Sequence, residues 1–227
     1  MSDSMISGPD CTARRSTRRW PLLLASLLLT ACGAKQVTVK GDFPQPTMSR
    51  QPITLGVFYP DEFRNHEFYD EAKGRAESDW LVKTGDAQMS MWNTLFNGMF
   101  ERVVFLDEMP GETAASEPDV DAVLIPEVEE LQYAIPTQTN SKVYEIWMRY
   151  GFNLKEPGGE PIAAWTMTAY GKTPTSFLQS DQAAVNLAAV VALRDAGAHF
   201  ATLFPRVPDV ASWLESRNQP ATAEIEL

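Results

Sequence analysis

The sequence has few of the residues on which the most easily recognised functions depend. Its 227 residues include only two Cys and two His, and 19 Lys and Arg stand against 30 Asp and Glu. Two cysteines cannot build the disulfide framework of a small secreted scaffold. A formal charge of −11 excludes the basic face with which nucleic-acid-binding proteins neutralise phosphates, so no nucleic-acid partner is expected.

A long apolar run lies near the start of the sequence. Arg14, Arg15, Arg18 and Arg19 precede it, residues 20–29 carry no charge, and small residues follow. A basic segment, a short apolar stretch and small residues are together typical of a secretory signal. The run is about half as long as the ~20 residues that a membrane-spanning helix needs. It is therefore predicted to direct export and not to remain as a spanning anchor.

The end of this leader, Leu29-Thr30-Ala31-Cys32, resembles the lipobox of bacterial lipoproteins. The resemblance implies that Leu29, Thr30 and Ala31 are read by the lipoprotein signal peptidase, which cuts before Cys32. It also implies that diacylglycerol is attached to the Cys32 thiol and a further acyl chain to its new amino group. Two or more chains anchor a protein stably. The alternative is that Cys32 is a core cysteine of a soluble domain and follows a buried helix. This alternative does not explain the four arginines that precede the apolar run.

The residues around Cys32 refine the expected location. Cys11 lies in the predicted leader, so a mature chain starting at Cys32 has no second cysteine for an internal disulfide. Loss of the leader, with four Arg and two Asp, shifts the charge from −11 to −13. In lipoprotein sorting of the enterobacterial kind, Asp directly after the cysteine favours the inner membrane. Gly33 therefore implies the outer membrane, with the protein on the periplasmic face.

The sequence divides into four parts by composition. Residues 1–31 are interpreted as a signal peptide, and 32–52 as the lipidated cysteine with a flexible, proline-containing tether. Residues 53–215 are predicted to form a single domain, and 216–227 a polar tail.

Hydrophobic periodicity predicts five strands and two long helices within the domain. In chain order these are a strand at 53–59, a helix at 86–100, strands at 103–106, 121–133, 143–154 and 162–170, and a helix at 181–203. Helices are few and most strands are consecutive along the chain. An α+β fold is therefore expected, with a mostly antiparallel sheet and both helices packed on one face.

Residues 143–154 alternate between two faces over their whole length, as in a strand with one buried side. Trp147 lies on the face opposite the regular apolar row. Aromatic residues and Arg are enriched at protein interfaces. Val143, Trp147 and Arg149 are thus predicted to form a docking patch for a protein partner in the envelope. The alternative is that a second layer, such as residues 205–214, covers this face.

No motif predicts a catalytic residue, a metal site or a cofactor. His66-Glu67-Phe68-Tyr69-Asp70 begins like the zinc motif H-E-x-x-H, but Asp70 stands at the second ligand position. His199, near a helix end, is expected to have a core or capping role. Gly171-Lys172-Thr173 ends like a P-loop without its earlier glycine, and is interpreted as a loop at a strand end.

The order of elements resembles that of small periplasmic lipoproteins that accompany envelope machines. The likeness rests on the opening strand Gly56-Val57-Phe58, the helix-strand unit at 89–106 and the hairpin before the Ala-rich helix. It implies a non-enzymatic accessory or docking subunit of a transport, secretion or assembly system.

Two other functions remain open at this point. One is a lipid- or small-molecule-binding periplasmic carrier, with a pocket between sheet and helices lined by residues 89–100. The other is an envelope hydrolase or metalloenzyme, which would need His66 together with Asp61, Glu67 or Asp70.

Overall fold

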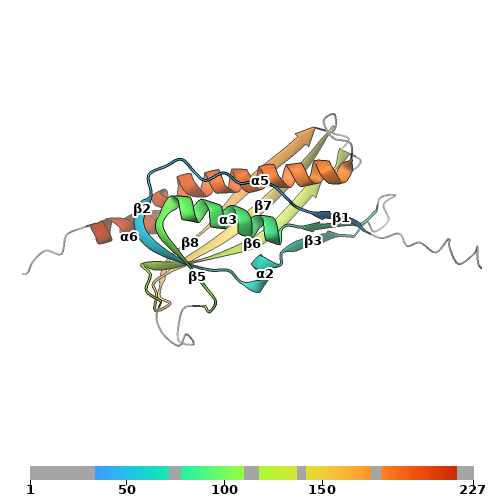
Figure 1. Ribbon diagram of the computed structural model, residues 1–227. Coiled ribbons are helices and arrows are strands. Elements are labelled where there is room, and N and C mark those ends of the chain that lie inside the picture. Colours follow the sequence, from blue (N-terminus) through green and yellow to red (C-terminus); the bar gives the residue numbers. More distant parts are fainter. Residues whose placement is uncertain (1–33, 72–77, 110–117, 137–141, 175–179, 219–227) are drawn as a thin grey trace, which may run out of the picture. The chain divides into compact units, whose positions relative to one another are not determined.

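The structure is a computed structural model, and it shows an α+β domain whose two main helices cover one face of a sheet (Figure 1). The residues it describes are 34–71, 78–109, 118–136, 142–174 and 180–218. The predicted signal peptide and Cys32 lie outside these residues.

The domain contains two sheets, one with five strands in the order β5-β2-β6-β7-β8 and one with three in the order β1-β4-β3. The elements are β1 (Lys35–Thr38), β2 (Gln51–Phe58), α2 (Asp61–Arg64), β3 (Glu67–Asp70), β4 (Trp80–Lys83), α3 (Gly85–Met99), β5 (Phe100–Leu106), β6 (Ala122–Ala134), β7 (Val143–Lys155), β8 (Pro161–Pro174), α5 (Asp181–Leu203), the 3-10 turn η3 (Phe204–Arg206) and α6 (Pro208–Asn218). The α+β class is confirmed, and the smaller sheet is an addition to the predicted fold.

The prediction of a mostly antiparallel sheet is wrong for one half of the large sheet. β6, β7 and β8 pair antiparallel, but β2 pairs in parallel with both β5 and β6. Parallel neighbours need a crossover of a dozen or more residues. Helix α3 lies in the connection from β2 to β5, and the chain between β5, which ends at Leu106, and β6, which begins at Ala122, is also long enough for a crossover.

The predicted flexible tether is wrong from residue 35 onward. Strand β1 pairs in parallel with β4, and Val37 and Val39 are buried. Residues 39–50, called the strap below, are then held on the two long helices. The side chain of Asn186 accepts a hydrogen bond from the Lys40 backbone N–H at 2.7 Å and donates to its carbonyl at 3.1 Å. The domain therefore begins at residue 34 or 35 and not at 53.

The strap continues across both helices. Arg194 donates to the backbone carbonyl of Asp42 at 2.8 Å. Pro46 lies so close to Gly98 of α3 that a Cβ there would meet the proline ring at 2.5 Å. The prolines and polar residues of this segment indicate disorder when they are read alone. The strap is ordered because side chains of α5 satisfy its backbone, and such partners, distant in sequence, leave no local signal.

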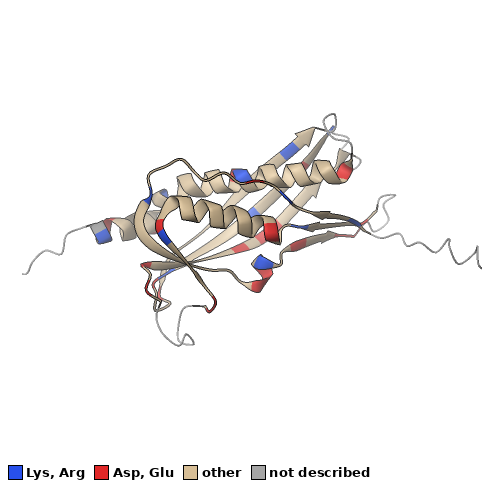
Figure 2. Cartoon of the chain, in the orientation of Figure 1, with Lys and Arg blue, Asp and Glu red and all other residues tan. Residues whose placement is uncertain are grey.

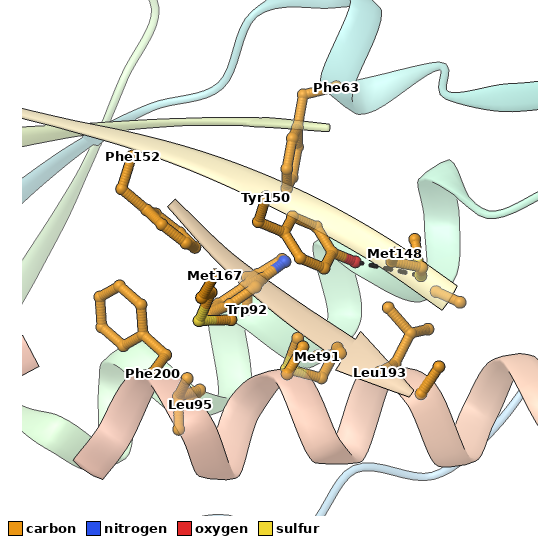
Figure 3. Packing of buried hydrophobic residues seen from close by; sticks show 14 of the residues in the cluster. Phe63, Met91, Trp92, Leu95, Met148, Tyr150, Phe152, Met167, Leu193 and Phe200 are labelled. Carbon is orange, nitrogen blue, oxygen red and sulfur yellow. Dashed lines mark hydrogen bonds between the residues drawn. The ribbon is translucent and has the colours of Figure 1, made fainter. Parts of the chain in front are cut away.

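Aromatic rings fill the space between the large sheet and the helices (Figure 3). Trp92 of α3 lies 5.4 Å from the rings of both Tyr150 and Phe152 of β7 and 5.5 Å from Phe200 of α5, measured between centroids. These edge-to-face contacts are favourable for aromatic pairs. Around Trp92, the layer in which the carrier hypothesis placed a pocket is therefore filled by side chains.

Helix α5 packs on β8 through small residues. A Cβ at Gly171 would lie 2.0 Å from the Ala188 carbonyl oxygen and 2.4 Å from the Ala192 backbone nitrogen. Only glycine allows two backbones to approach so closely. Ala188 and Ala192 are both fully buried, which explains the alanine content of this helix. Gly171-Lys172-Thr173 is therefore part of a strand, and its interpretation as a loop is wrong.

Charged side chains are sparse along α3 and α5 (Figure 2). Among the described residues one helix, taken together with η3 as residues 181–206, is long and apolar enough to cross a membrane. Half of its apolar window is buried inside the domain. Its composition therefore reflects its position in the core of the domain.

The chain end differs slightly from the predicted polar tail. Helix α6 continues to Asn218, so the first residues of the predicted tail are helical. Arg217 pairs with Asp121 at the start of β6, and Trp213 donates to the Glu156 carboxylate at 3.2 Å. These contacts hold α6 at the end of the sheet where β7 finishes.

The contact at Gly171 predicts a large cost for adding a single methyl group. Gly171→Ala should lower the free energy of unfolding by about 3 kcal/mol, because neither opposing backbone atom can move without shifting α5. Urea denaturation followed by circular dichroism measures this.

Gly151→Ala in β7 is the matched control. A Cβ there would meet side-chain atoms and no backbone atom at its nearest contacts: the Glu127 carboxylate at 2.6 Å, the Glu127 Cγ at 2.8 Å and the Glu129 carboxylate at 2.8 Å. Its cost should stay below about 1 kcal/mol. Equal losses in the two variants would contradict the close packing of α5 on β8.

Candidate functional site

The alternation predicted for residues 143–154 is confirmed, and it leaves Trp147 on the solvent side of the sheet. Its neighbours Ile146 and Met148 are buried under the helices, whereas Trp147 is 40% exposed. The second layer considered for this face does not cover the indole, because α6 contacts the opposite end of β7 through Glu156.

Trp147 is paired with an aromatic residue of the next strand. Tyr170 of β8 stands directly opposite it in the register, and the ring centroids are 4.9 Å apart. The Tyr170 hydroxyl donates to Glu145 at 2.6 Å. This hydrogen bond, with partial desolvation, raises the pKa of Tyr170 to about 12, so the phenol keeps its proton near neutral pH. The two rings form a pre-organised aromatic surface.

Arg149 lies beside this pair and is held by two carboxylates of β6. Its guanidinium is 2.7 Å from Glu129 and 3.1 Å from Glu130. Gln132 also donates to Glu130. Exposed ion pairs of this kind add little stability. Their effect here is to fix the orientation of the guanidinium next to Trp147.

These side chains surround a surface hollow of about 240 Å³. Its lining consists of Glu130, Gln132, Trp147, Met148, Arg149 and Thr168. The structure thus brings Trp147 and Arg149 together at one site. Val143 lies on the same face of β7 but four residues away, at the start of the strand, and is half-buried.

Tyr170, Glu130 and Gln132 also belong to this surface and were not predicted from the sequence. The signal for Tyr170 was present, because the turn-forming residues Glu156-Pro157-Gly158-Gly159 between the two predicted strands set the hairpin register that places Tyr170 opposite Trp147. The β6 residues had no such signal, since β6 and β7 shift register between Val128 and Glu130.

The free edge of β8 next to this surface is capped by α5. Asp195 accepts a hydrogen bond from the Tyr170 backbone N–H at 2.9 Å. His199 Nδ1 lies 3.0 Å from the Thr168 carbonyl oxygen and is placed to donate to it. Unpaired edge groups invite strand addition, and these side chains occupy two of them. The capping role expected for His199 is thus realised at a strand edge instead of a helix end.

His66 lies just before β3 and not on a helix, so the geometry of the zinc motif is absent. Its Nδ1 is 2.6 Å from the Thr84 hydroxyl oxygen. Burial lowers its pKa, partly offset by the nearby Glu67. Glu67 itself pairs with Lys83 at 3.4 Å. Within the described ranges no three His, Cys, Asp or Glu side chains are grouped so as to hold a metal ion.

A second hollow, of about 270 Å³, lies between the strap and the two helices α3 and α5. Phe43 and Pro46 of the strap, Met91 and Leu95 of α3 and Ala198 of α5 are among its lining residues. Met91 and Leu95 belong to the helix that the carrier hypothesis expected to line a pocket. The hollow is smaller than the ~300–1,000 Å³ of ordinary ligand sites.

Comparison with known protein families finds none that matches the chain, and none of the curated proteins matches it. Among solved structures, protein XCC0632 from Xanthomonas campestris, of the family DUF330, is similar with a TM-score of 0.53 and 13% identity. The alignment covers 82% of this chain and 100% of XCC0632. At this identity the similarity establishes a shared fold alone.

A minor lipoprotein from Acinetobacter baumannii is more distant. It aligns with a TM-score of 0.33 and 15% identity over 74% of this chain and 96% of its own. That level of similarity supports no conclusion about fold or function.

The buried position of His66 predicts a pH dependence of stability. Its pKa in the folded protein is lower than the ordinary value of 6.5. As pH falls below about 6.5 the unfolded chain binds a proton that the folded protein does not, so stability decreases. His66→Gln should remove this slope, which reaches at most about 1.4 kcal/mol per pH unit. Urea titrations at pH 5, 6 and 7 measure it.

His199→Gln controls for the loss of an imidazole at an exposed position. A slope between pH 5 and 7 that persists unchanged in His66→Gln would show that His66 is not its source.

Proposed function

We propose that the protein is an outer-membrane lipoprotein that acts as a non-enzymatic accessory subunit, docking on a protein complex of an envelope transport, secretion or assembly system. The observation that carries the docking role is the exposed Trp147–Tyr170 pair. The membrane location rests on the resemblance of Leu29-Thr30-Ala31-Cys32 to a lipobox.

The surface around Trp147 has the composition of a binding site and not of an active site. A large aromatic residue 40% exposed is next to a fixed guanidinium and a shallow hollow. Trp, Tyr and Arg are the residues most enriched among energetically dominant contacts between proteins. Glu129, Glu130 and Glu145 surround the aromatic pair and supply the polar rim that such interfaces have.

The two histidines have structural roles that leave little for acid–base catalysis. His66 is hydrogen-bonded to Thr84, and His199 to the edge of β8. A positioned base within reach of a nucleophile is the minimum for hydrolysis by covalent catalysis. The contacts of these two rings therefore favour a binding role over an enzymatic one.

The lipid anchor is tested by removing the acceptor thiol. Cys32→Ser should abolish incorporation of labelled palmitate and deplete the mature-length protein from the membrane fraction, because Cys11, the other cysteine of the sequence, is not preceded by a lipobox. Metabolic labelling and fractionation of the envelope measure both effects.

Cys11→Ser is the matched control, since Cys11 lies in the predicted leader and is removed on maturation. It should leave labelling and location unchanged. Palmitate incorporation into the Cys32→Ser protein, or its loss in Cys11→Ser, would contradict the assignment of Cys32.

The docking surface is tested by comparing two exposed aromatic residues. A photo-crosslinking amino acid at position 147 should yield a covalent complex in intact cells, whereas the same group at position 105 should not. With the captured protein purified, Trp147→Ala should weaken binding by about 30-fold, as expected for a dominant aromatic contact of about 2 kcal/mol.

Phe105→Ala is the matched control, because Phe105 is 44% exposed and belongs to β5 at the opposite edge of the sheet. Both variants should keep their stability within about 1 kcal/mol. Equal effects of the two substitutions on binding, or none of Trp147→Ala, would locate the interface elsewhere.

A further inference from the structure

The link between the predicted lipid and the folded domain is very short. Cys32 precedes Lys35, the first residue of β1, by three positions. Three fully extended residues span at most about 11 Å. The headgroup layer on each side of a bilayer is roughly 5–8 Å thick. A lipid on Cys32 therefore holds the start of β1 at the level of the headgroups.

Several elements begin or end at this point of the domain. Lys35 Nζ is 2.9 Å from the Asp181 carboxylate at the start of α5, and the Tyr144 hydroxyl donates to the same carboxylate from the start of β7. Lys35 also lies over the ring of Trp80, which begins β4, at 5.2 Å from its centroid. These residues, with the adjacent exposed Lys142, define what we call the anchor end of the domain.

The residues of the anchor end are held together by hydrogen bonds and by burial, so this end is not a frayed terminus. The hydrogen bonds from Tyr144 and Lys35 lower the pKa of Asp181, so this carboxylate remains ionised near neutral pH. Trp80 is buried. Through Asp181, Lys35 is therefore connected to α5 and to β7 of the large sheet. Anchoring Lys35 thus positions the whole domain and not only the three-stranded sheet.

The other end of the domain is far away. Strand β7 runs from Val143 at the anchor end to Lys155, and 13 strand residues at about 3.3 Å each cover roughly 40 Å. The turn after Lys155, with Glu160, and helix α6 lie at this far end. The chain also leaves β1 along α5, since the strap contacts Asn186 and then Arg194. The link thus joins the domain at its tip.

We infer that the anchor end is the membrane-facing surface of the domain, held against phospholipid headgroups so that the long strands point away from the bilayer. This inference rests on the proposed lipidation of Cys32. The carboxylates at this end have partners, Asp181 with Lys35 and Asp70 with the Tyr133 hydroxyl at 2.6 Å. Among the described residues of this end, Lys35 is already paired with Asp181, so the inference assigns the apposition to the short link.

The test uses two reporters at opposite ends of the β7–β8 hairpin. Lys142→Cys and Glu160→Cys each place one reactive thiol on an exposed residue, because the thiol of lipidated Cys32 is blocked. Each purified lipoprotein is labelled with a fluorophore and reconstituted into phosphatidylethanolamine–phosphatidylglycerol vesicles that contain a headgroup-attached nitroxide quencher.

The label at residue 142 should lose about half or more of its emission, and the label at 160 should keep it, because the quencher acts over about one headgroup layer and the ends are roughly 40 Å apart. Inserting about twelve Gly and Ser residues after Gly33 should restore the emission at 142, since such a link averages roughly 20 Å.

The outcomes separate this inference from the proposed function. Protein that floats with vesicles but shows equal quenching at both residues, or none at either, would overturn the orientation while the anchor stands. Quenching at 142 that survives the insertion would overturn the role of the short link. Protein that fails to float would overturn the lipid anchor, and the orientation with it.

Discussion

The structure depends above all on the close contact between α5 and β8. Gly171 lets the backbones of helix and strand touch, and the small side chains of Ala188 and Ala192 fit against it. With α5 packed this closely on β8, other residues of the helix can contact the strap and the first strand. Asn186 and Arg194 reach the strap, and Asp181 at its first turn reaches β1 and β7. One helix therefore organises the core, the N-terminal segment and the anchor end.

The elements that could be predicted from the sequence are those whose signal is local. The alternation of residues 143–154 and the periodicity of the helix around Trp92 result from burial of one face, and burial of one face leaves a repeating pattern. The segments that could not be predicted depend on distant partners. Strand β1 is short and its neighbour β4 is more than forty residues away, so neither Val37 nor Trp80 carries a readable period. The parallel pairing of β2 depends on crossover paths, which composition does not encode.

The candidate site shows the same division. Trp147 and Arg149 could be identified because strand alternation assigns them to the face away from the core. Whether that face is open depends on where α6 lies, and the Glu156 and Asp121 contacts that hold α6 at the far end join residues of separate elements. Glu130 and Gln132 reach the hollow only because β6 shifts register after Val128, a local irregularity without a sequence signature. The sequence thus predicts which face of a strand a residue occupies. Whether that residue belongs to an exposed surface depends on tertiary contacts.

The orientation inferred at the membrane and the docking surface constrain each other. Trp147 lies four strand residues from the anchor end, or about 13 Å along β7. If the anchor end faces headgroups, the aromatic pair lies close to the bilayer and points parallel to its surface. A partner that itself reaches the membrane surface then has better access to the pair than a soluble periplasmic one. The charge of −13 predicted for a chain that starts at Cys32 fits this division of roles, because an acidic domain gains nothing from adsorbing to anionic lipid. The lipid then supplies location, the short link supplies orientation, and the uncharged rings of Trp147 and Tyr170 remain free for a protein.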